Sequence, residues 1–422
     1  MKKQRRDFIK TAGLTSFGLA GGILTPQSFA FSSDSKKSGM TKSDLSIIGP
    51  YGPWANGLIN DQLPSLSYRN QRFTAIEPWK KDAMATVKER MGIPDLGPIP
   101  EVTVHDTYVD DGLVFEEVSW QLPYGNRTKA LVIKPDGAVG ELPAILAFHD
   151  HGGNKYFGLR KITKTGKDQH PMMIAHQEHY YEGKAWANEI AKRGYVVMVP
   201  DSFTFASRRV LLEEVPENRR AGLTDENPEK EENIEAYNNW AADHEHVMAK
   251  SLFCGGTSWP AVFFAEDQMA LEILLARKDV DSNNVGCGGL SGGGLRTVMM
   301  GGLDHRVKCA VCVGFMSTWT DFLLNRAYTH TWMAYIPRLP NELDFPEILG
   351  LRVPLPTLVL NDREDQLYTL PEMQKADKIL ASVFDKAGAS DKYRASYYPG
   401  LHKFDKAMQA EAFDWWDKWL KN

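Results

Sequence analysis

The sequence predicts an α/β domain with a mostly parallel central sheet, antiparallel strands at its N-terminal side and helices on both faces. Short, wholly apolar runs alternate with helical stretches in the later part of the chain, and such runs indicate strands covered on both faces. Strand-like segments joined by short turns precede them, which requires antiparallel pairing. With 43% hydrophobic and 24% charged residues among 422, the composition excludes disordered, coiled-coil and collagen-like classes.

The individual elements follow from these patterns. The antiparallel strands are expected at residues 102–109, 114–122 and 129–133, where alternating or β-branched residues are separated by turn residues. The apolar runs that predict parallel strands are residues 144–148, 195–199, 285–288, 307–313 and 357–360. Helices are predicted at residues 77–91, 184–193, 266–276, 295–300 and 404–420.

The first thirty residues are predicted to be an export signal. Four basic residues open the chain, a Gly-rich and moderately apolar run covers residues 12–24, and Ser28-Phe29-Ala30 supplies small residues for cleavage. The string Arg5-Arg6-Asp7-Phe8-Ile9-Lys10 resembles the twin-arginine signal of bacteria. We therefore expect a periplasmic or secreted protein with no stable membrane span after removal of the signal.

The rest of the chain divides into an N-terminal extension at residues 31–100 and a catalytic domain at residues 101–422. An insertion at about residues 202–260 carries a charged, Asn- and Glu-rich segment between a strand and a helix. Its position, above the carboxyl edge of the sheet, suits a lid or a substrate wall. A solvated surface excursion is the alternative, since long insertions cost little closure entropy.

The motif that carries chemistry is Gly289-Leu290-Ser291-Gly292-Gly293, which follows an apolar strand and precedes a helical stretch. A nucleophilic serine on a sharp strand-to-helix turn requires this context, because the strained turn tolerates only small neighbours. The helix N-terminus that follows points N–H groups at the developing oxyanion. We predict Ser291 as the nucleophile.

Partners for Ser291 follow in order along the chain. Asp365 lies in the loop after the strand at residues 357–360, and His402 follows the last strand directly before the C-terminal helix. The order serine, aspartate, histidine is that of α/β-hydrolases rather than of chymotrypsin or subtilisin. His402 is predicted as the general base and Asp365 as the acid that orients it, with Asp362 and Glu364 as alternative acids.

The oxyanion donors are predicted to be backbone N–H groups. Gly292 would supply one, and the glycine-containing loop after the first parallel strand would supply the other, from either His151 or Gly152. The same loop, with His149 and Asp150, also permits a metal site, as does the pair His176 and His179. Consecutive residues rarely converge on one ion, so no metal and no cofactor are expected.

The cysteines do not alter this expectation. Cys309-x-x-Cys312 resembles a redox or metal motif, but in a strand these two side chains point to opposite faces and cannot bind one ion. Together with Cys287 they are predicted to be buried in the core.

Trp259, Trp319 and Trp332, beside Phe203, are expected near the catalytic edge, where aromatic residues could stack on a sugar ring. Hydrophobic packing under a lid is the alternative interpretation of these aromatic residues.

From these motifs the chain resembles the dienelactone hydrolase and acetyl xylan esterase branch of the α/β-hydrolases. The matching stretches are residues 148–153, 280–293, 361–365 and 400–402, and the resemblance covers roughly residues 100–420. Secreted relatives of this kind often remove acetyl groups from sugars, which implies a carbohydrate deacetylase here. The chain departs from the pattern at Asp362, where many relatives carry Gly, and in its long acidic insertion.

The expected function is therefore that of an exported serine carboxylic-ester hydrolase acting on a small-molecule or oligosaccharide ester through an acyl-enzyme. The alternatives are a serine peptidase of the same fold and a catalytically silent carbohydrate-binding protein. The mildly acidic net charge of −5 makes nucleic acid an unexpected partner.

Overall fold

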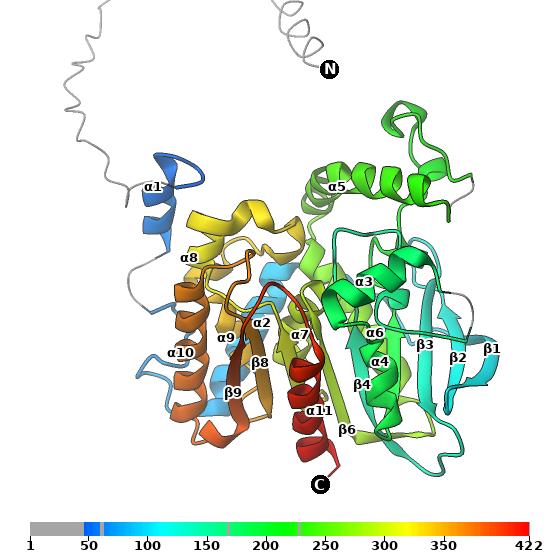
Figure 1. Cartoon of the computed structure of the whole chain (residues 1–422). Helices are drawn as coiled ribbons and strands as arrows, with labels where there is room; N and C mark the ends of the chain where they lie inside the picture. Colours follow the sequence, from blue (N-terminus) through cyan, green and yellow to red (C-terminus); the bar gives the residue numbers. More distant parts are fainter. Residues whose placement is uncertain (1–45, 60–62, 167–168, 227–228, 422) are drawn as a thin grey trace, which may run out of the picture. The chain divides into compact units, whose positions relative to one another are not determined.

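A nine-stranded mixed sheet runs through the protein (Figure 1). The structure, a computed structural model, describes residues 46–59, 63–166, 169–226 and 229–421. The predicted export signal at residues 1–30 and the start of the extension lie outside the described residues.

The strand order is β1-β2-β3-β5-β4-β6-β7-β8-β9. Strands β1, β2, β3 and β5 pair antiparallel in that order, whereas β5, β4, β6, β7, β8 and β9 are all parallel. The strands are β1 (Thr103–Asp110), β2 (Leu113–Trp120), β3 (Thr128–Pro135), β4 (Leu142–Phe148), β5 (Val196–Pro200), β6 (Val280–Leu290), β7 (Cys309–Val313), β8 (Thr357–Asp362) and β9 (Tyr393–Tyr398). This topology is the mostly parallel sheet with antiparallel N-terminal strands that the sequence predicts.

Helices cover both faces of the sheet. Residues of α4 and α11 pack in one buried cluster, in front of the sheet in Figure 1, and residues of α2, α6, α7, α9 and α10 pack in the other. The helices are α1 (Tyr51–Leu58), α2 (Ile76–Met91), α3 (Pro171–Tyr181), α4 (Trp186–Lys192), α5 (Glu231–Cys254), α6 (Trp259–Leu275), α7 (Gly292–Leu303), α8 (Trp319–Asp321), α9 (Phe345–Gly350), α10 (Leu370–Lys386) and α11 (Lys406–Leu420).

Side chains of each strand alternate between the two clusters. In β4, Ala144, Leu146 and Phe148 belong to one cluster, and Ile145 and Ala147 to the other. This is the period of two expected of an extended chain buried on both faces, and it explains why the run is apolar throughout.

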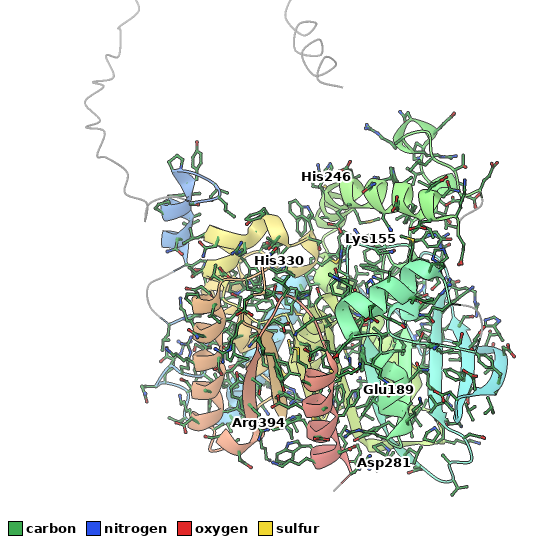
Figure 2. All side chains as sticks on the ribbon, viewed as in Figure 1. Lys155, Glu189, His246, Asp281, His330 and Arg394 are labelled. Atoms are coloured by element: carbon green, nitrogen blue, oxygen red, sulfur yellow. The ribbon has the colours of Figure 1, made fainter. Side chains whose placement is uncertain are left out.

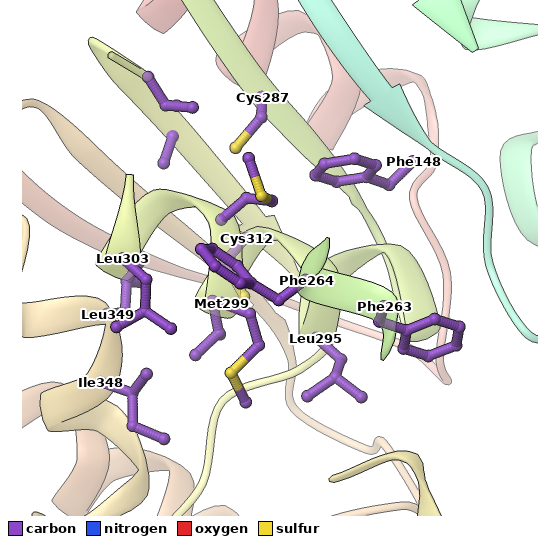
Figure 3. Close-up of a cluster of buried hydrophobic side chains, with 14 of the residues drawn as sticks. Phe148, Phe263, Phe264, Cys287, Leu295, Met299, Leu303, Cys312, Ile348 and Leu349 are labelled. Carbon is purple, nitrogen blue, oxygen red and sulfur yellow. The ribbon is translucent and has the colours of Figure 1, made fainter. Parts of the chain in front are cut away.

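The three cysteines of the strands are buried, as predicted. Cys309 and Cys312 in β7 point to opposite faces, since Cys309 lies in the α11 cluster and Cys312 in the α7 cluster. Figure 3 shows Cys312 and Cys287 among the apolar side chains that pack around Met299 of α7. Apolar packing, rather than a metal or disulfide, therefore accounts for them.

The N-terminal extension contributes to the same core. Helix α2 buries Trp79, Ala83, Val87 and Met91 in the α7 cluster. The described part of the extension that forms α2 is thus packed into one face of the domain.

The insertion packs one side against the domain, while many of its described side chains face solvent. Ile234, Tyr237 and Trp240 of α5 form a third buried cluster with Tyr156 and Phe157, which lie in the loop after β4. Figure 1 places α5 above the carboxyl ends of the parallel strands. The insertion is therefore attached to the loop that follows β4.

The predicted elements are recovered, but β6 begins five residues earlier than predicted and the structure adds helices that were not predicted, among them α1, α5 and α9. Helix α6 begins at Trp259, seven residues before the predicted start, because its first turns are apolar all round and almost wholly buried and so lack the periodicity of a surface helix. Helix α10 was not predicted, although its buried residues Met373, Ala376, Leu380 and Val383 recur at helical spacing. Within the described ranges, no helix is long and apolar enough to cross a membrane.

Candidate active site

Ser291 lies on a sharp turn between β6 and α7. Its backbone adopts φ 58° and ψ −117°, a strained conformation for a residue with a side chain. Its N–H donates to the carbonyl of Val313 at 2.9 Å, which ties the turn to the end of β7. A Cβ at Gly289 or at Gly293 would overlap the carbonyl oxygen of Phe148, so both positions require glycine.

Asp365 and His402 meet through their side chains. The His402 Nδ1 atom lies 2.7 Å from Asp365 Oδ2, and Asp365 Oδ1 accepts the N–H of Leu367 at 2.9 Å. Burial opposes charge on the imidazole, but the hydrogen bond and charge of Asp365 outweigh it and raise the pKa of His402. The hydrogen bond between Nδ1 and Asp365 therefore fixes the orientation of the His402 ring, with Nε2 directed away from Asp365.

The alternative acids have other partners. Asp362 Oδ2 accepts the N–H of Lys403 at 3.0 Å, and burial raises the pKa of Asp362 to about 7. The Glu364 carboxylate accepts the N–H of Gly400. The imidazole thus has its hydrogen bond to Asp365 and to neither Asp362 nor Glu364, although an oxygen of Asp362 lies within 4.8 Å of a ring nitrogen.

His402 is positioned close to the turn of Ser291. A Cβ added to Gly314 would lie 2.9 Å from His402 Cε1 and 3.0 Å from Leu290, so the ring packs against the backbone directly after β7. His402 Nε2 is buried and has no hydrogen-bond partner among the described residues. Such a nitrogen is available to accept a proton, and apo active sites often tighten this contact only with substrate bound.

Two backbone N–H groups lie together beside Ser291. Gly292 is the first residue of α7, so its N–H has no partner within the helix. A Cβ added to Gly292 would lie 3.0 Å from the His151 nitrogen. This proximity favours His151 over Gly152 as the second oxyanion donor.

A cavity of about 450 Å³ joins these groups. Ser291, Asp365, His402, His151, Gly152 and Gly292 all line it. Its apolar wall consists of Leu290, Leu295, Phe315, Met333, Ala334, Leu367 and Leu401. Among the described residues that line it, none is a lysine or an arginine. The volume falls in the ordinary range for a small-ligand site.

The predicted stacking residues do not line this cavity, which corrects the prediction. Trp259 and Trp319 are only 2% and 5% exposed. Trp259 packs edge-on against Phe203 at the start of α6, and Trp319 donates its indole N–H to the carbonyl of Leu343. Trp259 and Trp319 thus belong to the core, and Phe203 is partly buried against it, so their rings are covered by protein contacts rather than open to the cavity.

The prediction missed several lining residues, and His330 is a partly buried histidine among them. Its Nε2 lies 3.0 Å from the Leu367 carbonyl, and burial lowers its pKa to about 4. The ring is therefore neutral at pH 7. Figure 2 shows His330 beneath the yellow segment that bounds the site. A lone histidine in an irregular segment has no sequence pattern that would have identified it.

The side chains of His149 and His151, in the loop after β4, point toward different partners and do not converge on one point. His149 bonds to the Asp150 carbonyl and lies 3.1 Å from Ser202 Oγ, whereas His151 Nε2 lies 3.2 Å from Glu245. His176 bonds to the Asp150 carboxylate. The side chains of consecutive residues thus face different partners. In the described part of the chain, the one cluster with metal-ligand geometry is Asp362, Asp365 and His402, which contains the acid–base pair itself.

Comparisons with known proteins agree with this architecture. Residues 257–351, which include Ser291, match the sequence profile of the prolyl oligopeptidase family. The chain is 25% identical over 331 residues to the "Putative hydrolase YtaP" of Bacillus subtilis (strain 168), covering 78% of this chain and 95% of that protein.

Solved structures share the fold at low sequence identity. A "putative acetyl xylan esterase" from Bacteroides fragilis superposes with a TM-score of 0.58 at 17% identity, over 82% of this chain and 81% of the other. A glucuronoyl esterase from Solibacter usitatus gives 0.55 at 14% identity, over 84% and 97%. The described chain has the α/β-hydrolase fold, and its site has the arrangement of a serine hydrolase.

We expect Asp365→Asn to lower kcat by about 10⁴-fold, because an amide neither stabilises the imidazolium nor selects the productive tautomer. The matched variant Asp362→Asn should cost far less, since Asp362 bonds to a backbone amide. The wild type should also show a pH dependence. Its kcat/KM should fall as the pH is lowered, with a midpoint above pH 6.5, because His402 acts as a base only when neutral and its pKa is raised. Steady-state kinetics with an aryl ester between about pH 5 and 9 measures both effects. Equal losses in the two variants would contradict the assignment.

Proposed function

We propose that this protein is a serine carboxylic-ester hydrolase in which Ser291, His402 and Asp365 form the triad. The observation that carries the proposal is the convergence of these residues and the N–H groups of Gly292 and His151 on one cavity. The similarity to the named hydrolase and the shared fold of the two esterases support it.

In the proposed mechanism, Ser291 Oγ attacks the ester carbonyl carbon while its proton passes to His402 Nε2. The carbonyl electron pair moves onto oxygen, and the N–H groups of Gly292 and His151 stabilise the oxyanion. The bond to the alcohol breaks and the alcohol leaves with the proton from His402. Water then attacks the acyl-enzyme by the same route, which releases the acid and restores Ser291.

The cavity favours a short, uncharged acyl group. Its wall is largely apolar, and the described lining has no cation to pair with a carboxylate on the acyl side. An acetyl or similarly small acyl group fits this chemistry, because it requires only apolar contact and the oxyanion donors.

Exposed aromatic residues beside the cavity support a carbohydrate as the alcohol. Tyr328 and Trp332 are 70% and 39% exposed, and they flank the lining residues Thr329, His330 and Thr331 in sequence. Aromatic faces that remain open to solvent can stack on a sugar ring. Trp332 is among the aromatic residues that the sequence analysis named for this role, whereas Tyr328 is not.

Ser291→Ala is expected to abolish hydrolysis of p-nitrophenyl acetate and labelling by a fluorophosphonate while the fold is retained, because the attacking oxygen is removed. Kinetics, labelling and circular dichroism measure the outcome. The match to the prolyl oligopeptidase family makes peptide hydrolysis the second candidate, so the same preparations should be assayed with a chromogenic peptide. Full activity of Ser291→Ala would contradict the proposal, and peptide turnover exceeding ester turnover would favour the second candidate.

Tyr328→Ala and Trp332→Ala are expected to raise KM for acetylated oligosaccharides by about tenfold, the loss of a stacking contact of roughly 1.4 kcal/mol. Turnover of p-nitrophenyl acetate, which has no sugar to stack, should change little. Tyr51→Ala is the matched control, since Tyr51 is 67% exposed on α1 and does not line the cavity. Equal effects on both substrates would contradict a sugar platform.

We also propose export through the twin-arginine route, on the basis of Arg5-Arg6-Asp7-Phe8-Ile9-Lys10. Replacing Arg5 and Arg6 together by Lys should retain the protein in the cytoplasm of a bacterial host that has this pathway. Fluorophosphonate labelling of periplasmic and cytoplasmic fractions measures the distribution. An unchanged periplasmic fraction would contradict this route.

A further inference from the structure

Lys161 is a fully buried cation directly behind the oxyanion loop. It ends the short 3-10 turn η2 (Leu159–Lys161), and its side chain is 0% exposed. Burial lowers the pKa of Lys161 to about 8, against the opposing charges of Asp150 and Asp201, so the ammonium remains largely charged at pH 7. Burying such a charge is unfavourable for stability, and buried charges of this kind are frequent at functional sites.

The ammonium group bonds to two consecutive carbonyls of the loop. Lys161 Nζ donates to the carbonyl of Asp150 at 2.9 Å and to the carbonyl of His151 at 2.8 Å. The same carbonyls also accept from His149 Nδ1 and from the N–H of Asn154, respectively. Of the described side chains, Lys161 is the one that binds both carbonyls.

These two carbonyls belong to the peptide units that carry the candidate oxyanion donors. The Asp150 carbonyl shares its peptide plane with the His151 N–H, and the His151 carbonyl shares its plane with the Gly152 N–H. In a trans peptide the C=O and N–H point in opposite directions. Holding both carbonyls on the Lys161 side therefore turns both N–H groups to the opposite side.

The opposite side of the loop faces the turn that carries the nucleophile, Ser291. The His151 nitrogen would lie 3.0 Å from a Cβ on Gly292, and both His151 and Gly152 line the catalytic cavity. A cation on the carbonyl oxygen also polarises the amide and strengthens its N–H as a donor. We propose that Lys161 is a positioning residue of the oxyanion hole, which aims and polarises the N–H of His151 toward the substrate oxyanion.

A purely structural role makes a different prediction. The Lys161 ammonium lies 4.0 Å from Asp150 Oδ1, and Asp150 Oδ2 is bonded to Tyr181 and His176. If Lys161 served only to balance the buried charge of Asp150, then removing both charges together would restore the site. If Lys161 aims the loop, removing both charges leaves the carbonyls without their cation and the defect persists.

The experiment compares Lys161→Met with the double variant Asp150→Asn/Lys161→Met. We expect Lys161→Met to lower kcat on p-nitrophenyl acetate by about 10- to 100-fold, part of the loss seen when an oxyanion donor is removed. KM should stay within about threefold, because the ground-state ester does not need the donor. The affinity of a boronic acid, which forms a tetrahedral adduct on the serine, should fall in parallel with kcat.

The double variant should remain as slow as the single one. Lys164→Met, an exposed lysine three residues further along, is the control and should retain wild-type kinetics. A kcat of Lys161→Met within about threefold of wild type would overturn the proposal, and so would recovery of kcat in the double variant to that level. If the single variant fails to fold, the comparison of the double variant with Asp150→Asn alone decides the question: equal kcat in these two variants would overturn the proposal, and a kcat about 10- to 100-fold lower in the double variant would support it.

This inference rests on the proposed esterase function, and its failure is distinguishable from the failure of that function. If Ser291 is not the nucleophile, Ser291→Ala retains activity and fluorophosphonate does not label the wild type, whatever Lys161 does. If only the inference is wrong, Ser291→Ala is inactive while Lys161→Met is fully active.

Discussion

The close approach of β6, β4 and α7 at Ser291 is the constraint on which the site depends. The Phe148 carbonyl at the end of β4 leaves no room for a Cβ at Gly289 or Gly293, so the strand can turn into the helix only with glycine on both sides. The positive φ of Ser291 costs on the order of 1–3 kcal/mol, and such a conformation persists only where the surroundings over-determine it. Here the burial of nearly all of α7 supplies that stabilisation, since Gly293 through Leu303 are all buried.

A buried ion pair near the turn fixes how α7 packs against its neighbours. Arg296 of α7 bonds through Nε to Asp267 of α6 at 2.9 Å, and its guanidinium stacks over the Phe148 ring at 4.3 Å. The helix that carries Ser291 is thereby tied to the strand that carries the oxyanion loop. Buried ion pairs add little net stability, but their directional bonds restrict how the helix and strand can pack. On the other side of the loop, Lys161 binds the carbonyls of Asp150 and His151. The short segment at residues 148–152 is thus held from both sides.

The insertion is connected to the same segment. Glu245 of α5 pairs with both His151 and Lys155, and the side chain of Lys155 lies 5.4 Å from the Trp259 ring. Lys155 lies directly below α5 in Figure 2. Burial lowers the pKa of His151, and the bond to Glu245 only partly opposes this, so the ring is largely neutral at pH 7. A segment that is acidic in composition therefore contributes the partly buried carboxylate of Glu245 to the loop that bounds the cavity.

The sequence by itself determined the succession of strands along the chain, five of the helices, the strand-to-helix turn at Ser291 and the order of the predicted triad along the chain. These features depend on local patterns: apolar runs, helical spacing and the small residues that a tight turn requires. The tertiary structure decided which acid meets His402, which backbone N–H lies beside Gly292, and which aromatic residues remain exposed near the cavity. Asp362, Glu364 and Asp365 are equivalent as neighbours in a loop, and only the return of the chain after β9 brings His402 to Asp365. Trp259 and Trp332 are likewise equivalent in sequence, and the burial of one and exposure of the other follow from contacts between segments that are distant along the chain.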